Sequence, residues 1–486
     1  MNYRTVIGLE IHVELNTASK LFCGCSTDFG AEPNTHCCPV CAGLPGSLPM
    51  LNRWALELAL RAALSLKSRI NLFSRFDRKN YFYPDLPKAY QISQHYYPLA
   101  EGGHLEIDME EGIKKVHLQR VHLEEDTGKL LHADDSIMDS GYSLVDYNRC
   151  GIPLLEVVTA PEITSGRQAR LFLEELRLLL LYAGVSDCRM EEGSMRCDAN
   201  ISLAPPGKDL GTKVEVKNMN SFRAVEAALN HEEERQRKVL SSSQVLHQET
   251  RHWDESARHT YSLRGKEEES DYRYFPEPDL PPLQLKESWI EKILTSLPES
   301  PARRRKRFQE QYRLEPGDAE VLTSSPELAE FYEAAARSKT DPVVLAHWVK
   351  GEVLGLVKEK HLRVEELDPS PLVETLNLLN RGKINRNVAK DILAEALLKE
   401  VSPSRLVSSR GLERITDQEQ LLPLVEKVLA ENPRAVETYL AGREKAFDFL
   451  MGKVMGMTKG RADPVTVKQM ISEQLALINP ERGPKA

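Results

Sequence analysis

Residues 7–15 alternate strictly between apolar and other side chains, and this predicts a strand with two unlike faces. The odd positions are all Ile, Leu or Val, whereas the even positions include Glu10, His12 and Glu14. Because successive strand residues point to opposite faces, one face is apolar and the other carries two carboxylates and an imidazole. Residues two apart on a face are separated by roughly 7 Å, so Glu10 and His12 could converge on one ion or phosphate. An edge strand with a solvated face is the competing interpretation.

The chain has 486 residues, 41% hydrophobic and 28% charged, and this size suits roughly two to four globular domains. No run approaches the ~18 apolar residues of a membrane helix, and no apolar signal segment follows the first methionine. Eight cysteines, five of them between Cys23 and Cys41, do not form the pattern of a disulfide framework. We therefore expect a cytoplasmic protein that does not enter a membrane.

The net charge of -9 is unevenly distributed along the chain. Residues 405–486 hold 13 Lys and Arg against 11 Asp and Glu, a net charge of +2 that leaves -11 for residues 1–404. A mildly basic end is compatible with a segment that contacts nucleic acid. Gly452, Gly456 and Gly460 lie in this segment, and their spacing places bare backbone on one helix face. That face suits either phosphate groups or the close packing of another helix.

The predicted secondary structure changes near residue 294. Residues 1–293 read mostly as strands and turns, with helices predicted at 53–66, 165–184 and about 221–240. The remainder reads as helices, and the fold class is therefore α+β. We predict a curved antiparallel sheet in the first domain, an all-α middle domain at 294–404 and a small all-α tail domain at 405–486.

Proline marks the starts of three helices in the second half. Ser300 is predicted to cap a helix that begins at Pro301, and similar starts are expected at Asn432-Pro433 and Asp463-Pro464. The first of these helices carries the basic run 303–307. A solvated helix face and an RNA contact are both compatible with that run.

Two close pairs of cysteines lie within one short segment. Cys23 and Cys25 are separated by twelve residues from Cys38 and Cys41, a pattern that suits a structural zinc ion with four thiolate ligands. Ordinary reduced cysteines are the alternative, and Cys37 is not expected to be a ligand. A zinc deaminase signature fits poorly, because the proline here follows the first cysteine of the second pair and two thiols would have no role.

Further acidic residues lie on stretches that resemble the first strand. Residues 195–202 and 213–217 alternate, and Glu156 is the only charged residue in the apolar stretch 154–158. A carboxylate cluster is repulsive without cations, and magnesium with a nucleotide phosphate would satisfy it. No P-loop or Rossmann glycine motif is present. For each acid alone, plain solvation remains an alternative. The sheet face is predicted to gather Glu10, His12, Glu125, Glu156, Asp198 and Glu215.

Long and specific blocks of sequence are spread over the whole chain. They include Val-Ile-Gly-Leu-Glu-Ile-His-Val-Glu-Leu at 6–15, Leu-Glu-Glu-Asp-Thr-Gly-Lys at 123–129 and Arg-Cys-Asp-Ala-Asn-Ile-Ser at 196–202. These blocks resemble the B subunits of the bacterial aspartyl/glutamyl-tRNA(Asn/Gln) amidotransferases. Other matching blocks lie at 29–35, 43–46, 76–94, 271–279 and around 449–464.

The resemblance implies an activity and partners. It implies ATP-dependent transamidation of mischarged Glu-tRNA(Gln), Asp-tRNA(Asn) or both, which yields Gln-tRNA(Gln) or Asn-tRNA(Asn). The side-chain carboxylate is phosphorylated, and ammonia channelled from a glutaminase partner then displaces the phosphate. The implied partners are the amidase (the A subunit), a small third protein (the C subunit) and the tRNA, in a heterotrimeric ligase. The implied fold of residues 1–293 is a cradle related to glutamine synthetase, followed by helical domains that hold tRNA.

The resemblance also implies roles for individual residues. Glu10, His12 and Glu125 would hold magnesium within a catalytic pocket completed by Glu156, Asp198 and Glu215. Lys79, Tyr81 and Lys88 would lie near the ammonia entrance, where a lysine paired with Glu125 could act as a gate. The zinc ligands would be Cys23, Cys25, Cys38 and Cys41.

An alternative from another class is a non-catalytic RNA-binding scaffold with a structural zinc ion. The basic tail favours it, and the acidic strand face disfavours it. Binding of ATP and magnesium would separate the two interpretations. The sequence does not predict which of the two mischarged tRNAs is the substrate.

Overall fold

The computed structural model divides into two units, Met1–Arg303 and Arg304–Ala486. The boundary predicted between the two helical domains, at residue 404, stays a prediction. The end of the predicted tail domain lies outside the described residues, as does Asp271, the first residue of the matching block 271–279. The structure describes residues 3–132, 141–242, 244–265 and 272–478.

The first unit is built on a large mixed sheet. Its strands run in the order β15-β14-β13-β12-β1-β11-β8-β6-β2, and β7 also pairs with β8. Among the described residues, the strands of this sheet are β1 (Arg4–Glu14), β2 (Arg69–Ile70), β6 (Ala100–Glu101), β7 (His104–Met109), β8 (Gly112–Glu125), β11 (Pro153–Thr159), β12 (Met195–Ala204), β13 (Val214–Lys217), β14 (Glu249–Asp254) and β15 (His259–Gly265).

The alternating stretch at the start of the chain forms β1, which lies inside the sheet. It pairs antiparallel with β11 on one side and with β12 on the other. The interpretation as an edge strand is therefore wrong. From Ile7 to Glu14, the odd residues of β1 are buried and the even residues are partly exposed.

One strand pair departs from the predicted antiparallel sheet. β13 and β14 are parallel, with Glu215 opposite Thr250. The helix α3 (Phe222–Ser241) connects them. A helical crossover returns the chain to the end of the sheet where the first strand began, so that the next strand runs in the same direction. The prediction of an antiparallel sheet is correct for the other pairs and wrong for this one.

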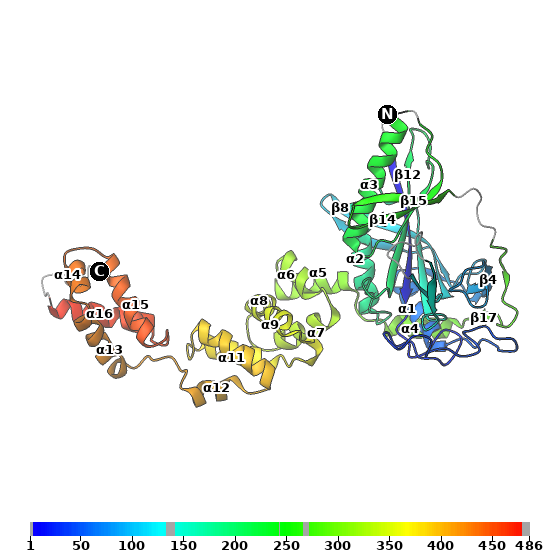
Figure 1. Cartoon of the computed structure of the whole chain (residues 1–486). Helices are drawn as coiled ribbons and strands as arrows, with labels where there is room; N and C mark the ends of the chain where they lie inside the picture. The colour runs from blue at the N-terminus through cyan, green and yellow to red at the C-terminus, as the bar shows by residue number, and fades with distance from the viewer. Residues whose placement is uncertain (1–2, 133–140, 243, 266–271, 479–486) are drawn as a thin grey trace. The chain divides into compact units, whose positions relative to one another are not determined.

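Helices cover the apolar face of the sheet. The predicted helices are confirmed as α1 (Arg53–Ser65), α2 (Gly166–Tyr182) and α3, and α4 (Glu287–Ser296) packs against α1. Figure 1 shows α2 and α3 along one side of the strands. Capping side chains fix the starts of the first three helices, because Asn52, Ser165 and Ser221 each accept a backbone N–H of the first turn.

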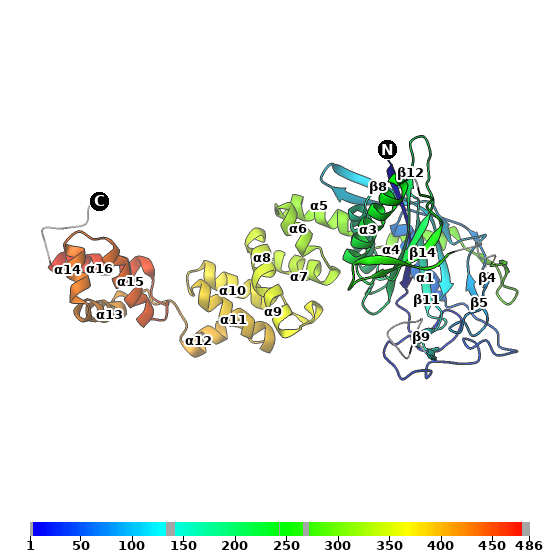
Figure 2. The ribbon, with the colours of Figure 1, turned by 45° about the horizontal axis from the view of Figure 1, so that its top comes forward.

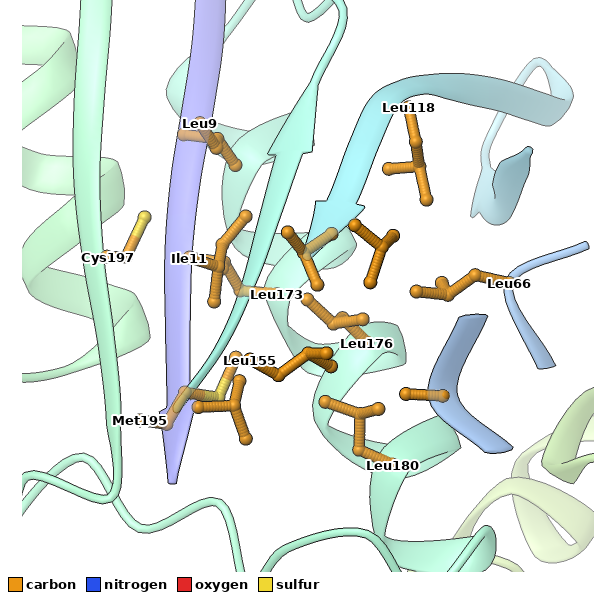
Figure 3. Packing of buried hydrophobic residues seen from close by; sticks show 14 of the residues in the cluster. Leu9, Ile11, Leu66, Leu118, Leu155, Leu173, Leu176, Leu180, Met195 and Cys197 are labelled. Carbon is orange, nitrogen blue, oxygen red and sulfur yellow. The ribbon is translucent and has the colours of Figure 1, made fainter. Parts of the chain in front are cut away.

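The core of the first unit lies between the sheet and α2. Leu9 and Ile11 of β1 point toward Leu173 and Leu176 of α2, together with Leu155 of β11 (Figure 3). All five side chains are buried. Burial of a leucine or isoleucine contributes roughly 1.5–3 kcal/mol, so this packing fixes which face of β1 remains open. The polar residues of β1 are left on the face opposite α2.

Short strands and a long coil complete the first unit. Residues 15–52 contain no helix or strand, and this segment carries the predicted zinc cysteines (Figure 2). The short strands are β3 (Phe73–Ser74) with β17 (Leu283–Gln284), β9 (Lys129–His132) with β10 (Ser143–Asp146), and β4 (Asp77–Asn80) between β5 (Tyr90–Ser93) and β16 (Phe275–Pro276).

The second unit is helical throughout its described part, and its boundary falls within α5 (Pro301–Tyr312). The helix starts predicted at Pro301, Pro433 and Pro464 are confirmed. α13 to α16 lie together around a core of their own (Figures 1 and 2). The further elements are α6 (Pro316–Leu322), α7 (Pro326–Ala336), α8 (Pro342–Trp348), η1 (Val349–Val353), α9 (Leu354–Lys360), η2 (Val364–Glu366), α10 (Ser370–Asn380), α11 (Arg386–Lys399), α12 (Pro403–Arg410), α13 (Gln418–Glu431), α14 (Pro433–Leu440), α15 (Lys445–Met457) and α16 (Pro464–Ile478).

In the part of the chain that the structure describes, no helix has the length and hydrophobicity needed to span a bilayer.

Candidate functional site

A histidine and two glutamates meet on the polar face of the sheet. His12 Nε2 lies 3.3 Å from Glu124 Oε1 and 3.6 Å from Glu156 Oε2. His12 stands opposite Glu156 in the β1–β11 register, and Glu124 reaches the same place from β8. His122 Nε2 lies 3.0 Å from Glu156 Oε2, so the carboxylate that looked isolated in an apolar stretch has two imidazole neighbours. The ligand atoms of His12, Glu124 and Glu156 are close enough to hold one metal ion.

Burial and charge act against each other in this cluster. Burial lowers the pKa of His12, but the contacts with Glu124 and Glu156 outweigh it and raise the pKa to about 10. Burial raises the pKa of Glu124, and the His12 contact more than compensates, so that its pKa is lowered. The pKa of Glu156 lies well below its usual value because His122 and His12 overcome the same burial. Both carboxylates are therefore ionised, and a cation bound between them would displace the proton from His12, because only a neutral imidazole has a nitrogen free to bind a metal.

Glu125, which the sequence placed on this polar face, lies on the opposite face of β8. Its Oε1 accepts hydrogen bonds from Lys88 Nζ and from the backbone N–H of Ile92. A β-bulge causes the difference: Val158 pairs with Arg120 and Thr159 with Leu118, which leaves one extra residue on β8. The extra residue reverses the alternation, so that Glu124 takes the position expected for Glu125.

The remaining predicted acids lie farther along the polar face. Glu10 accepts a hydrogen bond from Asn200 Nδ2 at 2.8 Å and stands opposite Asp198 in the register. Lys217 Nζ lies 2.6 Å from Asp198 Oδ2 and 3.1 Å from Glu215 Oε1. A lysine therefore offsets part of the repulsion for which magnesium was the predicted counter-charge. Within the described residues, neither Glu10 nor these two acids belongs to the His12 cluster.

The predicted channel residues lie near both carboxylates of β8. Lys88 pairs with Glu125, so the expected contact between a lysine and Glu125 is present. Lys79 Nζ lies 5.0 Å from the centre of the Tyr272 ring and 5.8 Å from that of Tyr81. Burial lowers the pKa of Lys79, and the charge of Glu124 outweighs it, so the pKa is raised and Lys79 is protonated. Lys88 therefore pairs with Glu125, whereas the charge of Lys79 interacts with that of Glu124.

The four predicted zinc cysteines come together in the long coil. Their sulfur atoms all lie within 4.8 Å of one another, and the sulfurs of Cys38 and Cys41 are 3.9 Å apart. A tetrahedral zinc site with Zn–S bonds of about 2.3 Å requires S–S distances of roughly 3.8 Å, so the geometry fits zinc. Contact with Cys23 lowers the pKa of Cys41 to about 4, which provides a thiolate. Cys37 lies near Asn148 instead.

Lys20 is a neighbour of this site that the sequence analysis missed. Its side chain is fully buried, and its Nζ lies 3.7 Å from Cys41 Sγ, 2.7 Å from the carbonyl oxygen of His36 and 3.3 Å from that of Tyr147. A zinc ion with four thiolates has a net charge of -2, which a buried ammonium group partly offsets. Lys20 lies in irregular coil, and no pattern around it in the sequence predicts its burial.

A cavity of about 210 Å³ opens beside Glu10 on the polar face of the sheet. Gly8 and Glu10 of β1 contribute to its floor, and Pro161 contributes to its wall. Gly8 and Glu10 are on the same face as His12, because side chains two residues apart share a face. The other lining residues include Val6, Val158, Asn200, Ser202, Leu210 and Lys213.

The basic run in α5 is partly used in folding. Arg307 Nη1 lies 2.6 Å from Glu333 Oε1, and Arg304 Nε lies 3.0 Å from Glu333 Oε2. The interpretation of the run as a wholly solvated face is therefore wrong for these two arginines. On α15, a side-chain atom added to Gly452 or Gly456 would meet nothing within 4 Å, so within the described residues no other helix packs on these glycines.

The geometry defines a protein with two candidate metal sites, one of histidine and carboxylate ligands on an open sheet face and one of four sulfurs. The chain belongs to the GatB/GatE family: the model of the GatB/GatE catalytic domain matches residues 5–291, and that of the GatB domain matches residues 330–475.

Curated relatives match nearly the whole chain, and each is the B subunit of an aspartyl/glutamyl-tRNA(Asn/Gln) amidotransferase. The relative from Carboxydothermus hydrogenoformans is 50% identical over 477 residues, which cover 98% of this chain and 99% of that protein. The one from Thermotoga neapolitana is 50% identical over 480 residues, with the same coverage. That of Caldicellulosiruptor saccharolyticus is 46% identical over 484 residues and is covered completely.

Proposed function

We propose that the chain is the B subunit of a tRNA-dependent amidotransferase, a ligase of protein biosynthesis. The observation that carries this conclusion is an identity of about one half with curated B subunits over 98% of the chain. The substrate is Glu-tRNA(Gln), Asp-tRNA(Asn) or both. The same proposal includes a fold of the first domain related to glutamine synthetase, in the form of a cradle. It also includes two partners, the amidase (the A subunit) and a small protein (the C subunit), and a cytoplasmic location.

The reaction requires two transfers. The side-chain carboxylate of the misplaced amino acid attacks the γ-phosphorus of ATP, and ADP leaves. Ammonia then attacks the acyl carbon and expels phosphate, which leaves glutamine or asparagine on the tRNA. The first step develops negative charge on the transferred phosphoryl group, and catalysis depends on positioning and on positive charge nearby.

The cluster of His12, Glu124 and Glu156 is the candidate metal site for this step. Magnesium bound there would neutralise phosphate charge during the transfer. The fit is supported by two ionised carboxylates whose oxygens lie 3.3 and 3.6 Å from the same imidazole nitrogen. Glu124 replaces Glu125 in the predicted ligand set, while Glu10, Asp198 and Glu215 are assigned to the surroundings of the nucleotide.

The cavity beside Glu10 is the candidate pocket for the nucleoside of ATP. Its apolar wall at Val6 and Val158 suits the faces of a purine, and Asn200 and Ser202 supply hydrogen-bonding groups. Lys213 lines the end of the cavity near Val6 and Ser202, which is the end away from His12. On β1, a nucleoside bound over Gly8 would direct its phosphates along Glu10 toward His12.

The surroundings of Glu125, on the opposite face of β8, are assigned to ammonia. Lys79, Tyr81 and Lys88 supply polar groups that suit ammonia, which both donates and accepts hydrogen bonds. Lys88 and Glu125 would form the gate. The zinc ion bound by Cys23, Cys25, Cys38 and Cys41 has a structural role in this assignment.

The tail domain is assigned to tRNA. Support comes from its net positive charge and from the bare backbone at Gly452 and Gly456 on α15. Lys453 lies on the same helix, with its Nζ 5.3 Å from the centre of the Phe449 ring. Helix backbone without side chains allows close approach of a phosphate chain.

Reconstitution with the partner proteins tests the proposed function. The complex, supplied with ATP, glutamine and each mischarged tRNA in turn, should convert at least one of them to the correctly charged form. Uncharged tRNA is the matched control and should not support amide formation. If neither mischarged tRNA is converted and calorimetry detects no binding of magnesium–ATP, the proposal fails and the RNA-binding scaffold replaces it.

A further inference from the structure

The segment that carries the four cysteines also forms one wall of a cavity. This cavity has a volume of about 190 Å³, and Lys88 and Glu125 lie at its other side. Its lining on the cysteine side includes Cys23, Cys41 and Gly43. The predicted metal site and the paired lysine and glutamate are therefore neighbours across a single small space.

Gly43 is the residue of the cysteine segment that lies against Lys88. It lies two residues after Cys41 and has a φ angle of +67°. A Cβ atom at this position would lie 2.3 Å from Cγ of Lys88 and 3.2 Å from its Cβ. The backbone of the segment thus lies directly against the aliphatic part of Lys88, and only glycine leaves room for it.

A second glycine, Gly151, lies close to both the cysteine segment and Glu125. A Cβ atom on Gly151 would lie 3.5 Å from Cβ of Cys41, 3.6 Å from Cδ of Lys20 and 3.9 Å from Oε2 of Glu125. Cys41, Lys20 and Glu125 therefore surround one glycine. Lys20 in turn donates to Cys41 Sγ. Cys41 therefore lies near Glu125 beside Gly151, and Gly43, two residues after Cys41, lies against Lys88.

Lys88 is confined by this wall and by Tyr90, whose ring centre lies 5.4 Å from Lys88 Nζ. Its side chain is only 8% exposed, and its ammonium group donates to Glu125. The cysteine segment itself contains no helix or strand, and turn hydrogen bonds such as that from the Gly43 N–H to the carbonyl oxygen of Val40 shape it. Four thiolates held by zinc would fix Cys41, and with it the position of Gly43 two residues later.

We propose that the metal bound by the four cysteines positions Lys88 against Glu125, in addition to stabilising the coil. Loss of the metal would release the backbone at Gly43 and expose Lys88 to solvent. This inference goes beyond the structural role assigned to zinc above. Its consequence for ammonia transfer rests on the proposed function, whereas the positioning itself does not.

Chemical labelling of lysine measures the positioning directly. The full chain is loaded with zinc and treated with an amine-acetylating reagent, and the rate at each lysine is read by mass spectrometry. Lys115, whose side chain is 56% exposed, serves as the internal reference. In the zinc-loaded protein, Lys88 should react at least tenfold more slowly than Lys115.

Two glycine variants separate the contact from backbone strain. Gly43→Ala places a methyl group against Lys88, whereas Gly46→Ala lies in the same segment, also has a positive φ of +87° and meets nothing within 4 Å. Both should retain zinc. Gly43→Ala should raise the rate at Lys88 about tenfold, and Gly46→Ala should leave it within twofold. Equal rates in the two variants would overturn the proposal.

Removal of the metal provides the second arm. A chelator applied to the folded wild-type chain, and Cys25→Ser independently, should raise labelling of Lys88 about tenfold relative to Lys115, and restored zinc should reverse the chelator's effect. An unchanged rate after the metal has left would overturn the proposal. The assay contains no ATP, tRNA or partner protein, so its outcome is independent of whether the proposed function holds.

Discussion

Glu124 and Glu125 are consecutive on β8, yet their carboxylates lie on opposite faces of the sheet. Glu124 Oε1 is 3.3 Å from His12 Nε2, while Glu125 Oε1 accepts the backbone N–H of Ile92 at 2.9 Å and also pairs with Lys88. Two adjacent residues therefore belong to two different sites. In the proposed reaction, Glu124 serves phosphoryl transfer and Glu125 serves the delivery of ammonia.

Glu125→Gln should uncouple the two half-reactions. The amide preserves the shape of the side chain but removes the charge that holds Lys88. We expect glutamine-dependent amide formation to fall at least about tenfold, because small displacements at a reacting centre have effects of that size, while tRNA-dependent ATP hydrolysis stays within threefold. Equal losses of both activities would contradict the separation of roles.

The buried Lys88 is left without its partner in that variant, which by itself destabilises the chain. The double variant Lys88→Met with Glu125→Gln removes both charges and controls for this effect. It should regain thermal stability relative to Glu125→Gln but should not regain amide formation.

The cysteines are expected to differ in metal binding. Cys38→Ser should lose zinc, because its sulfur lies 3.9 Å from Cys41 Sγ within the group of four. Cys37→Ser, the adjacent control, should keep one zinc per chain, because Cys37 lies near Asn148 instead. Metal analysis of the purified full chains measures the difference. Loss of zinc in both variants, or in neither, would contradict the assigned ligand set.

Glu333 should stabilise the helical unit in a pH-dependent manner. Burial raises its pKa, but Arg307 and Arg304 outweigh it and hold the pKa below its ordinary value. A carboxylate with a lowered folded-state pKa contributes stability above its unfolded pKa, and this contribution is lost as the pH falls through the folded pKa. Glu333→Gln should therefore cost about 1–2 kcal/mol at pH 7, after allowance for solvent screening, and much less near pH 3.

Hydrogen exchange in peptides from α7, which contains Glu333, measures this effect in the full chain. Glu330→Gln is the matched control, since Glu330 is exposed on the same helix. A pH-independent effect of Glu333→Gln, or an equal effect of Glu330→Gln, would refute the ion-pair explanation.

The tail prediction is tested by adding charge to an open helix face. Gly456→Asp on α15 should raise the Michaelis constant for tRNA about tenfold without changing kcat, because a carboxylate repels phosphate. Gly355→Asp on α9 is the control: Gly355 is also helical and meets nothing within 4 Å. A Michaelis constant that responds equally to both substitutions would show that the face at Gly456 has no special role.

The regular part of the fold was predictable because local patterns determine it. The alternation in the sequence of β1 corresponds to its buried and open faces in the structure. The capping residues before α1, α2 and α3 accept hydrogen bonds from the first turns of the helices that they precede. The parallel pairing of β13 with β14 was not predictable, since strand direction depends on the crossover through α3 and not on the strands themselves.

The site was predictable only up to the bulge in β8. The buried residues Val116 and Leu118 predict one alternation, and Val121 and Leu123 predict the opposite one. Strict alternation would separate two buried residues by an even number of positions, but Leu118 and Val121 are three positions apart, which indicates the extra residue. An interpretation of the sequence that included this bulge would have placed Glu124, and not Glu125, on the polar face. The pairing of Lys217 with Asp198 and Glu215 depends on strand register, which a single sequence does not supply.

The central claim is that the cluster of His12, Glu124 and Glu156 carries phosphoryl transfer, and Glu124→Gln tests it most directly. The measurement is ATP hydrolysis by the intact complex in response to mischarged tRNA, with Glu110→Gln, an exposed glutamate of the same unit, as the control. Removal of one preorganised charged group should lower the rate at least about 100-fold. The control should keep full activity. Hydrolysis by Glu124→Gln at the wild-type rate, with the complex intact, would contradict the account.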